Sequence, residues 1–321
     1  MAVRPSEPDL AAYLDDLRRT IDYALERAVT PHDTPALLDE AMRYALMGGG
    51  KRLRPCLTLA AAEAVGQQRG IDRDIARMLA LPSAVAVEMI HCYSLVHDDL
   101  PAMDDDALRR GRPTSHVVYG DGMAILAGDG LLTEAFRVLT ESPSRVMPAG
   151  VPEPPVERRV EAVRMLASAA GAVGMVGGQA IDLAAAGRVR SQSLQLDASA
   201  LEDMHRRKTG ALIRAATCLG ALAVGGDTET LAAVDHYARG LGLAFQIVDD
   251  VLDVEGSDAS LGKTAGKDAA AGKPTYPSLF GLDASRTLAA GAISRAKAAL
   301  AAVDLGGRLM EIADWSLVRK T

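Results

Sequence analysis

The stretch LALPSAVAVEMIHCYSLVHDDLPAMDDD (residues 79–106) joins a long apolar run to a cluster of five aspartates. Like charges placed this close repel one another and lower stability. A second stretch, FQIVDDVLDVEG at 245–256, repeats the arrangement, with an Asp-Asp pair near the end of an apolar helical run. We therefore expect two helices whose acidic ends face each other across a cavity.

Apolar residues recur at helical spacing over almost the whole chain. In residues 9–29 one stripe contains Leu10, Tyr13, Leu14, Leu17, Ile21, Ala24, Leu25 and Ala28. Similar stripes occur at 35–47, 55–66, 73–98, 123–140, 156–171, 199–224, 228–255 and 284–302. We find no alternating strand pattern, and one proline-rich connector, 142–155, reads as a loop. The pattern predicts one large all-α domain that spans residues 1–321.

Composition restricts the compartment and the partners. The 321 residues carry a net charge of −7, which gives no electrostatic footprint for nucleic acid. Cys56, Cys92 and Cys218 are far apart in apolar stretches, so we expect buried free thiols in a reducing cytoplasm. The chain opens with no signal-peptide pattern. The longest apolar stretch, 79–96, contains Glu88 and His91, which argues against a membrane span.

The acidic clusters have the spacing of a shared metal site. Asp249 and Asp253 are four residues apart and project from the same helix face. Asp98 and Asp104 are six apart, but Pro101 should break the helix and let Asp104 turn back toward Asp98. Oxygen ligands without nearby cysteine select Mg²⁺ or a similar cation. A solvated acidic helix end is the alternative for either cluster alone, and the presence of two favours a metal site.

Basic residues accompany both clusters. In GGGKRLRP (48–55), Lys51, Arg52 and Arg54 crowd the start of a helix, which indicates a bound anion such as phosphate. A basic surface turn is the alternative. Arg109 and Arg110 follow the first cluster, and further lysines lie near or before the second: Lys208, Lys263, Lys267 and Lys273. Mg²⁺ with such cations stabilises a departing phosphate. His91 lies seven residues before Asp98 on one helix face, although a lone histidine or tyrosine there is usually a core residue.

Taken together, these motifs resemble the trans-polyprenyl diphosphate synthase family, short-chain bacterial type. The resemblance covers nearly the whole chain and rests on GGGKRLRP (48–55), IHCYSLVHDDLPAMDDDALRRGRPTSH (90–116), GGQAIDL (177–183), HRRKTGALIRAA (205–216), FQIVDDVLDVEG (245–256), LGKTAGKD (261–268) and GKPTYPSLFGL (272–282). It implies an isoprenoid synthase-type bundle of antiparallel helices around a deep central cavity, a homodimer, and head-to-tail prenyl transfer. The substrates would be isopentenyl diphosphate and an allylic diphosphate, dimethylallyl or geranyl.

The resemblance also implies roles for individual residues. Asp98 and Asp104 would hold two of three Mg²⁺ ions and Asp249 the third, with Mn²⁺ as a possible substitute. The allylic diphosphate would be bound by Arg109, Lys208, Lys263 and the nearby Lys273. Isopentenyl diphosphate would be bound by Lys51, Arg54, His91 and Arg110. Thr209 and Gln246 would line the reacting centre together with Lys208, and the glycine-rich segment 256–274 would close over the site.

Product length depends in this family on a wall below the first acidic motif. Tyr93 lies five residues before Asp98, roughly 7.5 Å along the helix axis, and Ser94 is next to it. An aromatic residue there resembles bacterial farnesyl diphosphate synthases, whereas KTAGKDAAAGKPTYP (263–277) also resembles geranylgeranyl diphosphate synthases. We expect a C15 product, with C20 as the alternative.

Three rival interpretations remain. A class I terpene cyclase would normally carry an Asn/Ser/Glu-type second metal motif, whereas this chain has DDVLD and also retains GGGKRLRP. A non-catalytic subunit of a heteromeric synthase would be expected to lose one acidic motif, and this chain keeps both. A purely structural helical protein leaves the paired acidic and basic clusters unexplained.

Overall fold

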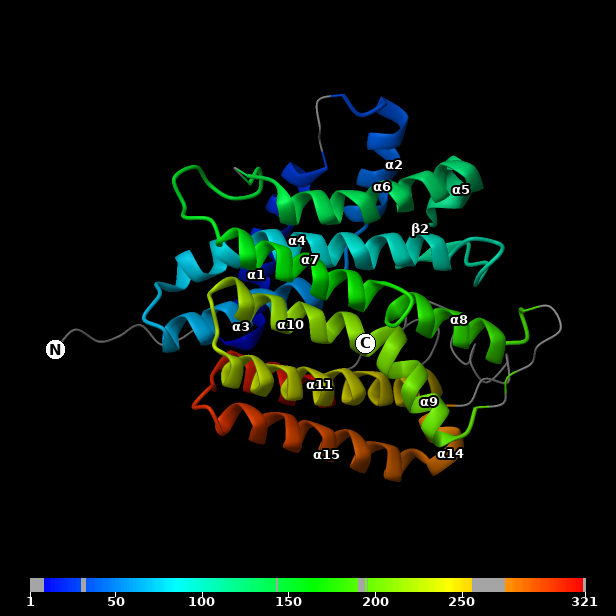
Figure 1. Ribbon diagram of the computed structural model, residues 1–321. Coiled ribbons are helices and arrows are strands. Elements are labelled where there is room, and N and C mark those ends of the chain that lie inside the picture. Colours follow the sequence, from blue (N-terminus) through cyan, green and yellow to red (C-terminus); the bar gives the residue numbers. More distant parts are fainter. Residues whose placement is uncertain are drawn as a thin grey trace.

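The computed structural model describes residues 9–29, 33–142, 144–189, 194, 196–255 and 275–319. These residues are almost entirely helical (Figure 1). The helices are α1 (Leu10–Ala28), α2 (Ala36–Leu46), α3 (Leu53–Gln68), α4 (Arg73–Asp98), α5 (Ser115–Tyr119), α6 (Asp121–Thr140), α7 (Val156–Ala170), α8 (Met175–Ala185), α9 (Ala198–His205), the π-helix η1 (Arg206–Gly210), α10 (Ala211–Ala223), α11 (Thr228–Glu255), α14 (Tyr276–Phe280), α15 (Leu282–Ala301) and α16 (Arg308–Val318).

The helical stripes predicted from the sequence are confirmed, with two refinements. The stripe at 199–224 is divided into α9, η1 and α10, because one turn at Arg206–Gly210 widens into a π-helix. A short hairpin, β1 (Leu108–Arg109) and β2 (Arg112–Pro113), follows the first acidic cluster. A two-residue strand is too short to show alternation, which is why the sequence pattern did not reveal it.

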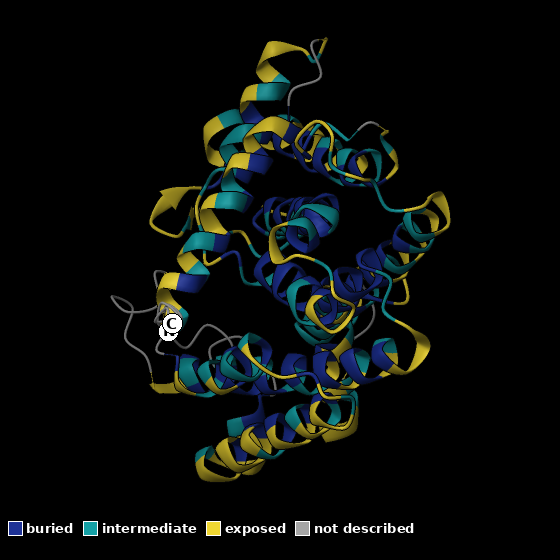
Figure 2. Cartoon of the chain, turned by 90° about the vertical axis from the view of Figure 1, so that its left-hand side faces the viewer, coloured by how far each residue is buried: buried dark blue, intermediate teal, exposed yellow. Residues whose placement is uncertain are grey.

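The helices stack in layers around α4 (Figure 1). Helix α4 packs between α6 on one side and α3 with α10 on the other, and α11 and α15 follow beyond α10. Seen along the bundle in Figure 2, the buried residues line the facing sides of these helices and the exposed ones lie on the outer surfaces. Helix α4 is buried along most of its length, so its acidic C-terminal end at Asp98 has a fixed position.

Small side chains allow the central helices to approach closely. A Cβ atom at Gly220 of α10 would overlap the backbone carbonyl of Thr58 on α3. Alanine and glycine at such contacts bring helix axes together, which agrees with a chain in which aromatic residues make up only 3%.

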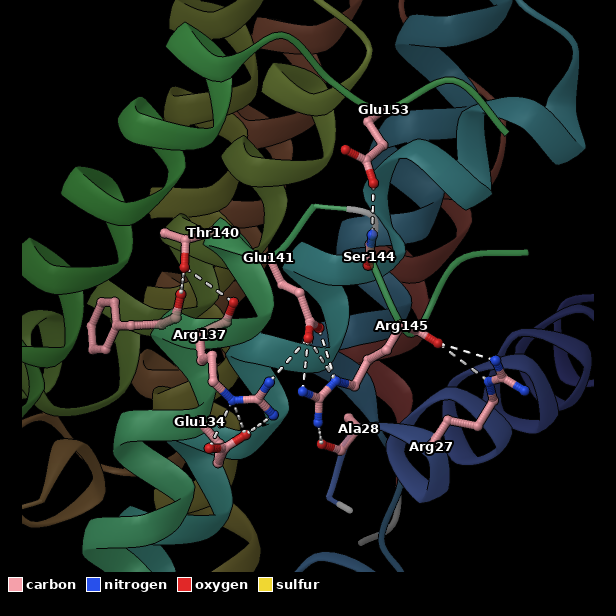
Figure 3. A network of polar contacts seen from close by, with 10 residues as sticks. Arg27, Ala28, Glu134, Arg137, Thr140, Glu141, Ser144, Arg145 and Glu153 are labelled. Carbon is pink, nitrogen blue, oxygen red and sulfur yellow. Dashed lines mark hydrogen bonds and ion pairs between the residues drawn. The ribbon is translucent and has the colours of Figure 1, made fainter. Parts of the chain in front are cut away.

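The proline-rich connector between α6 and α7 is tied down by polar contacts (Figure 3). The Arg145 guanidinium binds the Glu141 carboxylate at 2.7 Å and donates to the Ala28 carbonyl at the end of α1. Arg27 of α1 donates in turn to the Arg145 carbonyl. The Glu153 carboxylate accepts a hydrogen bond from the Ser144 backbone N–H. The connector therefore fastens the C-terminal ends of α1 and α6 to each other at the end of the bundle remote from Asp98.

Two helical stretches are long and apolar enough to cross a membrane by length and composition alone, Arg73–Asp98 and Val156–Ala185. In the first, 78% of the apolar window is buried inside the bundle, as in the core helix of a soluble protein. In the second, 33% is buried, and one or two such stretches are weak evidence for a membrane protein. The three cysteines are free and buried, as predicted.

Candidate active site

The first acidic cluster begins where α4 ends. Helix α4 stops at Asp98, and the chain turns back so that the Asp104 N–H donates to the Asp98 carbonyl at 2.8 Å. The break expected before Pro101 is thus confirmed. Burial, together with the charge of Asp104, raises the pKa of the Asp98 carboxyl to about 6, although Lys208 opposes that rise. Within the described ranges, no hydrogen bond or ion pair engages the side chain of Asp98 or Asp104, so their oxygens are available to a ligand.

Asp99, the neighbour of Asp98 in the sequence, forms an ion pair instead of presenting free oxygens. Asp99 is buried, and both its oxygens accept hydrogen bonds from Arg109, at 2.5–3.0 Å. Arg109 also contacts Asp106 at 3.4 Å. Such a bidentate pair fixes the guanidinium plane. Its Nη1 has no partner in the described part of the chain, so one edge of Arg109 can still bind a phosphate oxygen.

The hairpin β1–β2 directs the adjacent residues Arg109 and Arg110 to different partners. Arg110 and Gly111 form the two-residue turn, both with positive φ (54° and 74°), as a type I′ hairpin requires. The Arg110 guanidinium reaches across to the Gly49 carbonyl and lies against Gly50, where a Cβ atom would overlap it. Glycine at position 50 thus makes room for Arg110 beside the GGGKRLRP loop.

The three basic residues of that loop do not act together as expected. Arg52 is turned inward and is 3% exposed, so it cannot bind an anion at the surface. Lys51 remains exposed, with Nζ 5.8 Å from the Trp315 ring centre on α16. The Arg54 Nε is buried and has no hydrogen-bond partner among the residues that the structure describes. Lys51 and Arg54 therefore remain as the loop's candidate anion ligands.

His91 lies on α4 among these cations. Its pKa falls well below the ordinary value because the ring is buried and because Arg54 and Arg110 repel a second positive charge. The imidazole is consequently neutral at pH 7 and can donate one hydrogen bond to an anion without bringing a charge of its own.

Two adjacent side chains of the π-helix η1 interact with the two acidic regions of the site. Lys208 Nζ pairs with Asp182 of α8 at 2.5 Å, and its pKa is raised because Asp182 and then Asp98 and Asp104 outweigh its burial. The next residue, Thr209, donates from Oγ1 to Gln246 Oε1 on α11 at 2.9 Å. A π-turn is a recurrent feature of functional sites. In this protein the π-turn directs Lys208 toward Asp98 and Asp104, and it directs Thr209 toward α11.

In the second Asp-Asp pair, as in the first, one aspartate is buried and hydrogen-bonded and the other is more accessible. Asp250 is buried and accepts hydrogen bonds from Gln246 Nε2 at 2.9 Å and from the Tyr276 N–H at 3.0 Å. Asp249 is more open, with 42% of its side chain exposed, and pairs with Arg319 after α16 at 2.6 Å. Asp253, predicted to share a face with Asp249, is buried. Asp249 is thus the accessible carboxylate of this motif.

The structure describes the predicted metal ligands Asp98, Asp104 and Asp249, but only one of the lysines predicted to bind the allylic diphosphate, Lys208. Among the described residues, no three His, Cys, Asp or Glu side chains converge on one point as a preformed metal site. The lysines Lys263 and Lys273, and the segment 256–274 expected to close over the site, lie outside the described residues.

Tyr93 and Ser94 occupy different environments on α4. Tyr93 is buried, and its ring meets the His97 ring edge-on at 5.7 Å between centres. His97 Nε2 lies 3.1 Å from the Ile125 carbonyl, so this face of α4 is directed toward α6. Ser94 instead bonds the His91 carbonyl within its own helix at 2.9 Å. Tyr93 is the residue of the two whose size can limit the space between α4 and α6.

Two partners were not assigned a role from the sequence. Asp182 belongs to GGQAIDL, but nothing in that motif reveals that it pairs with a lysine 26 residues away. Arg319 follows the last helix, and its guanidinium also stacks on the Phe245 ring at 3.7 Å. Its contact with Asp249 spans 70 residues, a separation at which local spacing carries no signal.

Comparison with known proteins agrees with this geometry. Residues 35–303 match the polyprenyl synthetase family. The chain is 42% identical to the farnesyl diphosphate synthase of Geobacillus stearothermophilus over 92% of both sequences. It is 44% identical to geranylgeranyl pyrophosphate synthase 7 of Arabidopsis thaliana over 88% of this chain and 75% of that protein. The crystal structure of an FPP/GFPP synthase from Zymomonas mobilis superposes with a TM-score of 0.77 at 35% identity, covering 96% of this chain and 99% of that one. The chain belongs to the polyprenyl synthetase family.

Proposed function

We propose that this chain condenses isopentenyl diphosphate with an allylic diphosphate in a head-to-tail prenyl transfer. The supporting observation is that cations gather at two separate places beside the carboxylates. Lys208 pairs with Asp182, and Asp182, Asp98 and Asp104 raise its pKa. Lys51 and Arg54 instead belong to the loop that the Arg110 guanidinium contacts at Gly49. Two diphosphates that must react without exchanging places need two such pockets.

The residues present fit a divalent cation. Among the described residues, no hydrogen bond or ion pair occupies the side-chain oxygens of Asp98 and Asp104, and Asp249 offers a partly exposed carboxylate, with no thiol among the three. We assign Asp98, Asp104 and Asp249 as ligands of up to three Mg²⁺ ions, or Mn²⁺ in substitution. Because no three carboxylates converge in the described residues, diphosphate oxygens would complete each coordination shell. The bound metal would withdraw electron density from the leaving diphosphate.

The chain's own residues hold the two substrates. Arg109, through its open edge, and Lys208 bind the allylic diphosphate and stabilise its charge as the C–O bond ionises. Lys51, Arg54, Arg110 and neutral His91 hold isopentenyl diphosphate. The hydroxyl of Thr209 donates to Gln246, so its lone pairs can face the allylic carbocation. The isopentenyl double bond attacks that cation, and the proton lost afterwards passes to the released diphosphate.

Product analysis by mass spectrometry tests the proposal directly. Purified protein is incubated with Mg²⁺, isopentenyl diphosphate and dimethylallyl diphosphate, with EDTA added to a parallel sample. We expect elongated prenyl diphosphates that disappear with EDTA. No elongation from C5, C10 or C15 starters would refute the synthase assignment.

The half-buried Asp98 carboxylate should destabilise the metal-free protein. A carboxyl whose pKa rises on folding costs free energy above its unfolded pKa of about 4, and protonation in the folded state relieves that cost as the pH falls below about 6. In EDTA at pH 7.5, Asp98→Asn should therefore unfold at higher denaturant, by an amount on the order of 1–2 kcal/mol after allowance for partial exposure. The gain should fall by about half at pH 5. A variant less stable than the parent at pH 7.5 would contradict this cause of the shift.

We further propose that Tyr93 ends the product at C15, with C20 as the alternative. Its ring is buried on the α4 face directed toward α6, so truncation opens space there. Tyr93→Ala should lengthen the main product by at least one C5 unit, measured by mass spectrometry of the dephosphorylated prenols. Tyr93→Phe, which keeps the ring, should retain the parent product. An unchanged product in Tyr93→Ala would place the wall elsewhere.

A homodimer through α5 and α6 is the third element of the proposal. These adjacent helices expose four large apolar side chains, Val117, Val118, Ile125 and Leu126, each between 43% and 53% exposed. Clustered apolar exposure of this kind marks protein interfaces. Val118→Glu with Leu126→Glu should convert a dimer to a monomer in light scattering after size exclusion. Leu288→Glu on α15, where the leucine is 43% exposed, serves as the control and should leave the mass unchanged.

A further inference from the structure

Arg52 is the most deeply buried basic residue of the GGGKRLRP loop. It stands at the start of α3 with a left-handed backbone, φ 51° and ψ 34°. The guanidinium donates to the Asp22 carboxylate of α1 at 2.9 Å, the Glu88 carboxylate of α4 at 2.8 Å and the Leu46 carbonyl at the end of α2 at 2.8 Å. One side chain thus ties three helices to the backbone of the loop.

The backbone conformation of Arg52 needs this support. A non-glycine residue in the left-handed region is strained, and such strain persists only where surrounding contacts impose it. The three hydrogen bonds of the guanidinium are those contacts. Lys51 and Arg54 leave the same stretch of backbone on either side, so the direction of both depends on how residue 52 is held.

Glu88 provides the second half of the arrangement. It is 2% exposed on α4, one helical turn before His91. Its negative charge favours the charged forms of Arg54 and Arg110, which otherwise repel each other. A buried carboxylate among three guanidinium groups allows them to stand closer than their charges alone would permit.

We propose that the Arg52–Glu88 ion pair positions the isopentenyl diphosphate pocket without contacting the substrate. The pair holds the loop in its strained conformation and sets the spacing of Lys51, Arg54 and Arg110. This inference rests on the proposed function, which assigns those three cations to isopentenyl diphosphate. Arg52 and Glu88 are accordingly positioning residues and not ligands.

The chain contains a matched control for a purely structural role. Arg77 of α4 also ties three helices together, two of which, α1 and α4, belong to the Arg52 network as well, since it pairs with Asp16 of α1 at 2.9 Å and with Glu63 of α3. Its side chain is 10% exposed, and it lies eleven residues before Glu88, away from the loop. Loss of either arginine network should reduce stability, but only the Arg52 network should affect substrate binding.

The experiment compares Arg52→Lys and Glu88→Gln with Arg77→Lys in the full-length protein. For each, the melting temperature is measured, and KM is determined separately for isopentenyl diphosphate and for the allylic starter. We expect Arg52→Lys and Glu88→Gln to raise KM for isopentenyl diphosphate about tenfold, and KM for the allylic diphosphate less than about twofold. Arg77→Lys should lower the melting temperature and leave both KM values within about twofold of the parent.

Two results would overturn the inference. One is an equal rise in both KM values, and the other is no rise in spite of a lowered melting temperature. If Arg52→Lys does not fold, Glu88→Gln decides alone, because it removes a charge and keeps the side-chain shape. Calorimetric titration measures the dissociation constant of inorganic diphosphate for the same variants, and it does not depend on turnover. An inactive parent protein would therefore refute the proposed function and still leave the positioning role testable.

Discussion

The placement of negative charge at the buried end of α4 is the constraint on which the rest of the site depends. A carboxylate removed from water is costly unless it is paired, protonated or bound to a cation. Asp99 is paired, because both of its oxygens accept hydrogen bonds from Arg109. Asp98 is left unpaired within the described residues, with a raised pKa. The second aspartate of the motif is thus structural, and the first remains for a ligand.

The same division recurs across the site at Asp249 and Asp250. Asp250 is buried and holds Gln246 and the backbone of Tyr276, so it fixes the side chain that orients Thr209. Asp249 is open enough to meet Arg319, which neutralises it. A carboxylate has two oxygens with about four lone-pair sites, so Asp249 can accept the Arg319 hydrogen bond and still present lone pairs to a cation. Arg319, which follows α16, therefore belongs to the electrostatics of this site, although it lies far from Asp249 in sequence.

Much of the fold could be predicted because apolar periodicity is a local property. The stripes at 73–98 and 228–255 correspond to α4 and α11 at both ends, and Pro101 correctly signalled the end of α4. The inward turn of Arg52 could not be predicted, because it depends on carboxylates from α1 and α4 that only the folded chain brings together. The π-turn at η1 was equally hidden, since one added residue per turn leaves the helical pattern almost unchanged.

The positive charges show why a motif alone does not define a pocket. Sequence proximity groups Lys51, Arg52 and Arg54, and it groups Arg109 with Arg110. The fold redistributes them: Arg109 stays with Asp99, and Arg110 crosses to Gly49 beside the loop. Arg52 withdraws beneath the surface to pair with Glu88. The β1–β2 turn at Arg110 and the left-handed backbone of Arg52 at the start of α3 make this rearrangement of the arginines possible, because each changes the direction of neighbouring side chains. The fold thus separates basic residues that are adjacent in the sequence and brings Arg110 beside a loop glycine that is 61 residues away in the chain.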